Sequence, residues 1–183
     1  MLVPQEEVVA KALVFAYKAH DGQVRKYTGE PYIVHPIAVA ALVASVTDNQ
    51  DMIAAALLHD TVEDTDVTIE DIQREFGGYI AAWVSDLTDV SKPEDGNRAV
   101  RKAIDLQHTA RALPPAKTIK LADLIDNSKS ILERDPNFAV YYMKEKRALL
   151  EVLKEGDKTL YAMAKKIVDD YFNVINKGKN GKP

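Results

Sequence analysis

The chain has 183 residues, of which 46% are hydrophobic and 28% charged, the balance of a globular domain with a sizeable core. Its net charge of −4 provides no overall attraction to nucleic acid, and the lack of cysteine excludes disulfides, thiolate catalysis and cysteine-ligated zinc. The sequence has no signal-peptide pattern and no apolar run of membrane-spanning length, so we expect a cytoplasmic protein with neither a membrane nor a nucleic-acid partner.

Apolar residues recur at helical spacing along most of the chain, and strand-like alternation does not extend beyond a few residues. We therefore predict an all-α fold, a single helical domain over residues 1–176, followed by a disordered polar tail at residues 177–183. Capping residues, glycines and prolines divide the chain into helices that we expect at residues 5–21, 36–46, 50–61, 68–76, 79–90, 98–113, 116–133, 138–154 and 158–174.

Two segments between the predicted helices are notable. Residues 23–35, QVRKYTGEPYIVH, are expected to form an ordered loop that ends at His35, the N-cap of the helix that Pro36 begins. Residues 91–97, SKPEDGN, form a polar turn and are the internal segment that we expect to be most flexible. Ordered loops often carry function, which directs attention to the first segment.

The most informative stretch is an apolar helix that ends in a histidine and three acids. The apolar residues 53–58 lead directly into His59 and Asp60, and Glu63 and Asp64 follow. Carboxylates held close together repel one another and oppose the helix dipole at this end, so a cation is the usual compensation. Imidazole and carboxylate are together a ligand set for Mn²⁺, Fe²⁺ or Zn²⁺. The alternative interpretation is a solvated helix end with acidic capping residues.

A metal site needs ligands from separated segments, and two more candidates are suitably placed. His35 stands at a loop-to-helix junction, and Asp123 follows an apolar run, where a buried acid needs a partner. With His59 and Asp60 they give two imidazoles and two carboxylates, with room for water.

The positions of residues near these four candidate ligands suggest further roles. Glu63 and Asp64 would lie just outside it, where they could accept a proton from water or simply cap the next turn. Asn127 lies one turn after Asp123 on the same helix face, whereas Asp126 is expected to be solvated.

The loop and the remaining histidines allow weaker interpretations. A guanidinium such as that of Arg25 can lie on a purine face, and the ammonium of Lys26 can meet phosphate, although basic runs are more often merely solvated. We interpret His20 as complementing the dipole at the end of the first helix, and His108 as a surface or packing residue.

Three stretches, in this order, resemble the motifs of the (p)ppGpp hydrolase domain of the RelA/SpoT family. They are RKYTGEPYIVHP at residues 25–36, LLHDTVEDT at residues 57–65 and KLADLIDN at residues 120–127. The resemblance implies an HD-domain helical bundle and a stand-alone small alarmone hydrolase, similar to the metazoan SpoT homologues. It also implies hydrolysis of the 3′-pyrophosphate of (p)ppGpp to give GDP or GTP and pyrophosphate.

The resemblance assigns roles to ten residues. It implies one Mn²⁺ held between helices by His35, His59, Asp60 and Asp123. It implies that water is activated by Glu63 and Asp64. It implies a purine-nucleotide pocket in which the base, the phosphates and the ribose are contacted by Arg25, Lys26, Tyr32 and Asn127.

Two departures from the family pattern leave the substrate open. Tyr27 is an extra residue relative to the RKSGEPY of the long enzymes, and residues 124–126 read Leu-Ile-Asp where long enzymes commonly have Arg-Leu-His. The adenine analogue (p)ppApp is therefore an alternative substrate, and an HD phosphohydrolase of another nucleotide is an alternative activity. A catalytically inactive nucleotide sensor is a third interpretation, against which the presence of both Glu63 and Asp64 argues. The sequence leaves the oligomeric state, a dimer included, open.

Overall fold

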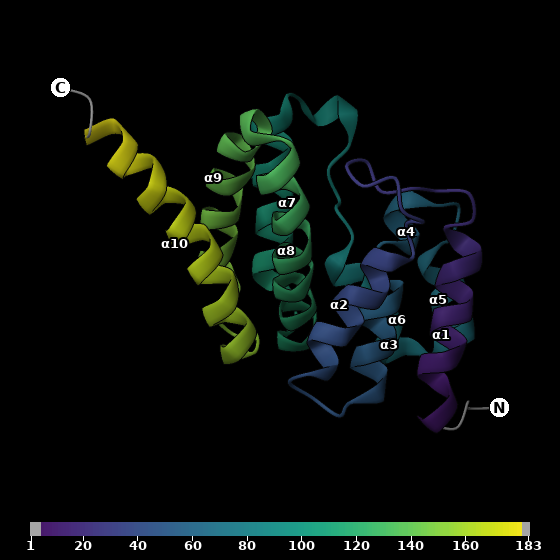
Figure 1. Cartoon of the computed structure of the whole chain (residues 1–183). Helices are drawn as coiled ribbons and strands as arrows, with labels where there is room; N and C mark the ends of the chain where they lie inside the picture. Colours follow the sequence, from purple (N-terminus) through teal and green to yellow (C-terminus); the bar gives the residue numbers. More distant parts are fainter. Residues whose placement is uncertain (1–4, 181–183) are drawn as a thin grey trace.

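The computed structural model describes the backbone of residues 5–180 and the side chains of residues 7–176. Helices α1 to α6 lie on one side of the bundle and α7 to α10 on the other (Figure 1). Within the described residues the β pairing is limited to an isolated bridge between Val24 and Pro31, so the predicted all-α class is confirmed. The helices are α1 (Gln5–Ala19), α2 (Val34–Ala44), α3 (Gln50–Leu58), α4 (Thr61–Asp64), α5 (Ile69–Phe76), α6 (Gly78–Leu87), the 3₁₀ helix η1 (Pro93–Asp95), α7 (Arg98–Arg111), α8 (Pro114–Arg134), α9 (Pro136–Val152) and α10 (Lys158–Asn180).

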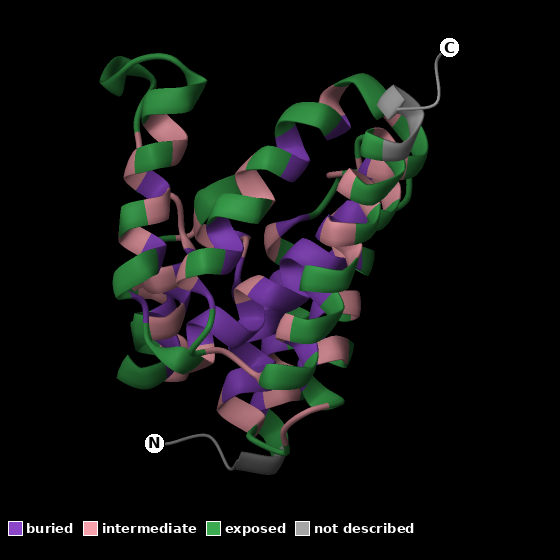
Figure 2. Ribbon diagram, turned by 90° about the vertical axis from the view of Figure 1, so that its left-hand side faces the viewer, coloured by how far each residue is buried: buried purple, intermediate pink, exposed green. Residues whose placement is uncertain are grey.

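Helix α3 lies at the centre because most of its length has no polar face. All of residues 52–58 are buried, and a helix that is apolar on every side needs neighbours all around it. It packs against α1, α2, α6 and α8. Figure 2 shows the buried residues gathered in the middle of the bundle and the exposed ones on its outside. This packing places the end of α3, where His59 follows, deep inside the protein.

Helix α8 joins the two sides of the bundle. Pro114 and Pro115 lie in its first turn, where a missing N–H breaks no intrahelical hydrogen bond. The helix packs against α2, α3 and α6 on one side and against α9 and α10 on the other. Gly156, between α9 and α10, approaches it so closely that an added Cβ would lie 2.8 Å from Leu121 Cδ1 and 3.1 Å from the carbonyl carbon of Lys117. A side chain at this position would have to move the Leu121 side chain and press on the backbone of α8.

Two helix boundaries near the predicted ligands differ from the sequence prediction. The N-cap of α2 is Ile33, so His35 lies inside the first turn instead of capping it. The helix expected to reach residue 61 ends at Leu58, because the Thr61 hydroxyl donates to the Leu58 carbonyl at 2.7 Å and the backbone leaves the helical path at Asp60 (φ −98°, ψ −4°).

The C-terminal helix is longer than predicted. Helix α10 continues to Asn180, so the tail predicted to be disordered from residue 177 is helical as far as residue 180, and residues 181–183 lie outside the described residues. Ion pairs at i and i+4, between Lys165 and Asp169 and between Lys166 and Asp170, support this helix. Once nucleated, a helix extends by a further turn at little cost, which the local sequence pattern did not indicate.

The segment expected to be most flexible, residues 91–97, is tied to α7 where it begins. The Asp105 carboxylate accepts hydrogen bonds from Val90 N at 3.1 Å, from Ser91 N at 2.9 Å and from Ser91 Oγ at 3.0 Å. Three acceptor contacts to one buried carboxylate hold the start of this segment in one position.

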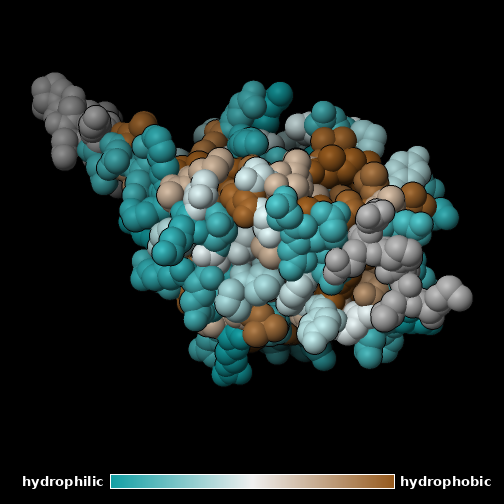
Figure 3. All heavy atoms as spheres, turned by 90° about the horizontal axis from the view of Figure 1, so that it is seen from below, coloured by the Kyte–Doolittle hydropathy of each residue, from teal (hydrophilic) through white to brown (hydrophobic). Residues whose placement is uncertain are grey.

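The outer surface has the mixture expected of a helical bundle. Seen from below, hydrophilic side chains cover much of the surface and hydrophobic ones gather in separate groups (Figure 3). Among the described residues, no helix combines the length and the apolar character that a membrane span requires.

Candidate metal centre and adjoining cavities

Two histidine rings from different helices meet in the interior. His35 from the start of α2 and His59 from the end of α3 are each 1% exposed, and their ring centroids lie 5.1 Å apart. The His59 Nδ1 lies 2.8 Å from the carbonyl oxygen of Ala56, and the His35 Nδ1 lies 2.8 Å from Asp126 Oδ2. Because these oxygens can only accept, each Nδ1 carries a hydrogen, and each Nε2 is left to bind either a second proton or a metal ion.

The two Nε2 atoms face carboxylate oxygens instead of hydrogen-bond donors. Asp123 Oδ1 lies 3.3 Å from His35 Nε2 and 3.9 Å from His59 Nε2, and Asp60 Oδ2 lies 3.4 Å and 3.0 Å from the same two nitrogens. Both Nε2 atoms are buried without a hydrogen-bond partner among the described residues. The ligand atoms of His35, His59 and Asp123 lie within 4.8 Å of one another, so these residues could hold a metal ion. Orphaned imidazole nitrogens beside carboxylates fit a divalent cation, and Asp60 as a fourth ligand stays a prediction.

The electrostatics of the cluster call for a positive charge between these groups. Burial alone would lower the pKa of His35, but Asp123, Asp126 and Asp60 outweigh it and raise that pKa to about 11. Burial opposes ionisation of Asp60 and Asp123 as well, yet the neighbouring histidines, together with Lys120 in the case of Asp123, hold the pKa of both carboxyls below the usual range. A proton or a metal cation can supply this charge.

Asp126 is not solvated as the sequence analysis expected. Its Oδ2 accepts from His35 Nδ1 at 2.8 Å and from Arg25 Nη1 at 2.7 Å. The side chain is 13% exposed, and the pKa of Asp126 is lowered because these two partners outweigh the opposing effect of burial. Asp126 lies three residues after Asp123, and residues three apart share a helix face, so the spacing itself was a signal that we missed. A carboxylate in this position fixes the orientation of a metal-binding histidine.

Glu63, Asp64 and Tyr32 lie on the wall beside the cluster. The Tyr32 hydroxyl donates to Asp60 Oδ2 at 2.6 Å and lies 3.0 Å from Asp64 Oδ2. Glu63 Oε2 accepts from Asp89 N at 3.3 Å. Desolvation in the pocket and the charge of Asp89 raise the pKa of Glu63 to about 7. Desolvation and the charge of Asp60 raise the pKa of Asp64. Both acids are therefore disposed to take up a proton, which suits a general base, and their catalytic roles stay predictions.

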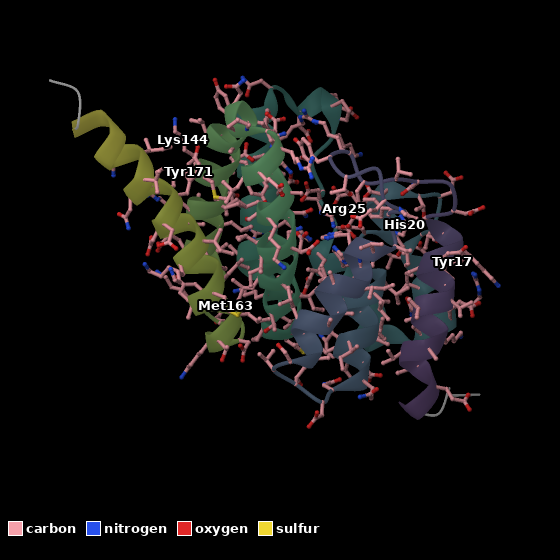
Figure 4. The ribbon with its side chains drawn as sticks, viewed as in Figure 1. Tyr17, His20, Arg25, Lys144, Met163 and Tyr171 are labelled. Atoms are coloured by element: carbon pink, nitrogen blue, oxygen red, sulfur yellow. The ribbon has the colours of Figure 1, made fainter. Side chains whose placement is uncertain are left out.

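Of the predicted substrate-binding residues, Asn127 and Arg25 contact the cluster or its neighbours, whereas Lys26 lies at the surface. Asn127 Nδ2 donates to Asp123 Oδ1 at 2.6 Å, and its Oδ1 accepts from Arg25 Nη2 at 3.1 Å. Figure 4 shows Arg25 reaching from the loop after α1 toward α8. Lys26 is exposed, with its Nζ 4.9 Å from the ring centroid of Tyr27. Arg25 thus contacts Asp126 and Asn127, next to the candidate metal ligands. Base stacking by Arg25 and phosphate binding by Lys26 stay predictions.

The other two histidines lie outside the cluster. His20 follows α1 as expected but is buried, with Nδ1 2.8 Å from Gln23 Oε1. His108 has a packing role, as predicted, because its Nε2 lies 3.0 Å from the carbonyl oxygen of Ser85.

A cavity of about 590 Å³ opens beside the cluster between α4, α7, α8 and α9. Its acidic end contains Asp60, Glu63, Asp64, Asp89 and Asp123, with Tyr32 and Asn127 beside them. The rest of its lining combines small and apolar side chains with cations, including Ala99, Ala103, Leu106, Leu149, Lys102, Lys144 and Lys146. The sequence analysis missed these lysines, since no local motif marks them. Arg25 and Lys26 are not among the described residues that line this cavity.

Comparison with known proteins agrees with this geometry. A family model described as the HD domain matches residues 12–149. The chain belongs to the HD domain family. This HD domain is 38% identical to a guanosine-3′,5′-bis(diphosphate) 3′-pyrophosphohydrolase of Aquifex aeolicus over 125 residues, which cover 68% of this chain and 18% of that protein. It is 37% identical to the protein of the same name in Vibrio cholerae over 131 residues, covering 70% of this chain and 18% of that protein.

A solved structure has the same arrangement of helices. It is described as a metazoan orthologue of SpoT that hydrolyses ppGpp, and it matches this HD domain with a TM-score of 0.81 and 27% identity. The match covers 93% of this chain and 98% of that one. By contrast, the chain spans only 18% of the length of the two bacterial relatives.

Proposed function

We propose that this HD domain hydrolyses the 3′-pyrophosphate of (p)ppGpp and releases GDP or GTP and pyrophosphate. The observation that carries the proposal is the buried cluster of His35, His59 and Asp123 at one end of a nucleotide-sized cavity, with Glu63 and Asp64 on the same wall. The two bacterial relatives are named 3′-pyrophosphohydrolases, and the metazoan structure is described as hydrolysing ppGpp, which supports the choice of reaction.

The metal that we propose is Mn²⁺, held by His35, His59, Asp60 and Asp123 in a cytoplasmic protein. The mixed imidazole and carboxylate donors, with two buried Nε2 atoms that lack partners, support a borderline divalent ion. When bound, such an ion supplies Lewis-acid activation of phosphate and water. Asp126 and the Ala56 carbonyl orient the two imidazoles for it.

The chain's own side chains perform the proton transfers. Glu63, whose raised pKa suits a base near neutral pH, accepts a proton from the attacking water. The water oxygen forms a bond to the phosphorus attached to the 3′ oxygen, and the bond between that phosphorus and the 3′ oxygen breaks. Pyrophosphate is released as one piece, and the 3′ oxygen takes up the proton that Glu63 received, which gives the hydroxyl of GDP or GTP and restores the base. Asp64, bridged to Asp60 through the Tyr32 hydroxyl, orients the water.

The charge distribution in the cavity suits a nucleotide that carries phosphates at both ends. Lys120 Nζ lies 3.7 Å from Asp123 Oδ2, so positive charge is present beside the cluster. Burial and the charges of Lys120 and Lys102 outweigh the opposing charge of Asp123 and lower the pKa of Lys146 to about 8, which a bound phosphate would reverse. We place the nucleoside along the apolar residues between α7 and α9, with its 5′ phosphates near Lys144 and Lys146 and its ribose beside Asn127.

The decisive experiment is a product analysis. The Mn²⁺-loaded protein is incubated with ppGpp, ppApp and other purine nucleotides, and the products are separated by anion exchange. We expect equal amounts of GDP and pyrophosphate from ppGpp, with no turnover in chelator. Orthophosphate as the first product, or full activity in chelator, would overturn the proposal.

A further inference from the structure

A second cavity of about 410 Å³ adjoins the first on the far side of Glu63. Glu63, Asp89 and Lys102 line both cavities, so the two spaces meet at the proposed base. The remaining lining residues come from α4, from the end of α6 with its following loop, and from α7, and they are Val62, Thr88, Ser91, Arg98 and Arg101. No function has so far been given to this space.

Helix α7 turns three cations toward the second cavity. Arg98, Arg101 and Lys102 stand at i, i+3 and i+4 and therefore share one helix face. Arg98 is engaged by Glu145, to which its Nε and Nη2 donate at 2.8 Å each. Lys102 donates to Asp89 Oδ2 at 2.5 Å. Two of the three cations thus already have acid partners.

Arg101 differs from its two neighbours. Its Nε is buried and has no hydrogen-bond partner among the described residues. A buried charged donor without an acceptor is costly, and because Arg101 also lines the cavity, an anion bound there can pair with its guanidinium. Two other polar residues that line this cavity already have hydrogen-bond partners. Ser91 is bound to Asp105, and the Thr88 hydroxyl donates to the Val84 carbonyl at 2.8 Å.

We propose that the second cavity is an anion subsite that binds the distal phosphate of the 3′-pyrophosphate, with Arg101 as its principal contact. The identity of the anion rests on the proposed function. Because Glu63, Asp89 and Lys102 line both cavities, a pyrophosphate whose inner phosphorus reacts beside Glu63 would have its distal phosphate next to the second cavity, which Arg101 lines. Arg101 would hold the distal phosphate of the pyrophosphoryl group while that group is transferred to water, and it would favour a 3′-pyrophosphate over a 3′-monophosphate.

The main cavity makes this placement preferable to one that puts the 5′ phosphates in the second cavity. The main cavity is the larger, and it alone combines an apolar surface for a nucleoside with the additional cations Lys144 and Lys146. The second cavity offers polar and charged groups with space for a small anion.

The test compares the binding of the two products, which the enzyme cannot hydrolyse further. Dissociation constants for pyrophosphate and for GDP are measured by equilibrium dialysis, with Mn²⁺ in constant excess, for the wild type and Arg101→Gln. We expect pyrophosphate to bind about 10- to 100-fold more weakly to the variant, the range of a lost charged hydrogen bond. GDP and Mn²⁺ should bind as in the wild type. Arg111→Gln, an exposed arginine on the same helix, is the matched control and should change neither constant.

Each outcome decides the proposal. Unchanged pyrophosphate binding in a folded Arg101→Gln protein, or a loss confined to GDP, would overturn it. If Arg101→Gln does not fold, Arg101→Lys is measured instead, because lysine keeps the charge but lacks the planar fork of the guanidinium. Weaker pyrophosphate binding by Arg101→Lys would support the proposal, and wild-type binding would overturn it. Failure of the proposed function is distinguishable, since a wild type that binds pyrophosphate through Arg101 but does not cleave ppGpp keeps the subsite and loses the reaction.

Discussion

Replacing Asp126 with asparagine tests whether this carboxylate organises the metal cluster. Asp126 Oδ2 accepts hydrogen bonds from His35 Nδ1 at 2.8 Å and from Arg25 Nη1 at 2.7 Å. Asparagine keeps the size of the side chain but removes the negative charge that interacts with His35 and Arg25. Losing an outer partner of a metal-binding histidine typically weakens metal binding about 10- to 100-fold, which corresponds to about 1.4–2.7 kcal/mol.

The same loss has a stability readout that does not require enzymatic activity. At a Mn²⁺ concentration of about 1,000 times the dissociation constant, binding stabilises the fold by about 4.1 kcal/mol, and a site tenfold weaker leaves about 2.7 kcal/mol at that concentration. Urea unfolding over a series of Mn²⁺ concentrations, with calorimetric titration of the metal, measures this difference. Asp66→Asn, which changes an exposed acid near α4, is the control. Equal Mn²⁺ dependence in Asp126→Asn, Asp66→Asn and the wild type would refute the reasoning.

Three further predictions concern the cluster and the base. His59→Ala should abolish stoichiometric Mn²⁺ binding and the stabilisation linked to it, and metal analysis showing full occupancy would contradict this. Glu63→Gln should keep Mn²⁺ and substrate binding and reduce turnover by about 10²-fold or more, measured by single-turnover kinetics; near-normal turnover would move the role to Asp64. Because the base acts in its ionised form, kcat/KM should fall as the pH drops through the pKa of Glu63, at about 7 or below since a bound cation favours the carboxylate. This acid limb should be absent in Glu63→Gln, and an unchanged pH profile would exclude Glu63 as its origin.

The sequence was sufficient for the parts of the site that local pattern determines. His59 and Asp60 end an apolar run that must be buried, and Asp123 follows another, so their chemistry could be placed inside the protein before its fold was known. His35 was found because a histidine beside proline marks a junction, although it lies in the first turn of α2 instead of capping it.

The rest of the site depends on contacts between segments far apart in the chain. Asp126 was expected to point away from Asp123 and to be solvated, but its partner Arg25 lies 101 residues earlier, where no local pattern indicates the contact. Arg101 lies in an ordinary amphipathic helix, and its cavity exists only where α4, the loop after α6 and α7 meet. No local pattern carries that information.

A substitution at Gly156, which does not line the cavity, is expected to affect metal binding. It lies in the turn between α9 and α10, and it presses against α8 at Lys117, Thr118 and Leu121. Leu121 stands two residues before Asp123, so a side chain at position 156 would press on the helix that carries one of the proposed ligands. Gly156→Ala should first weaken the binding of the metal ion, although no residue that lines the cavity has changed. Natural variants at this position would then resemble metal-site mutants, although none of the ligands has changed.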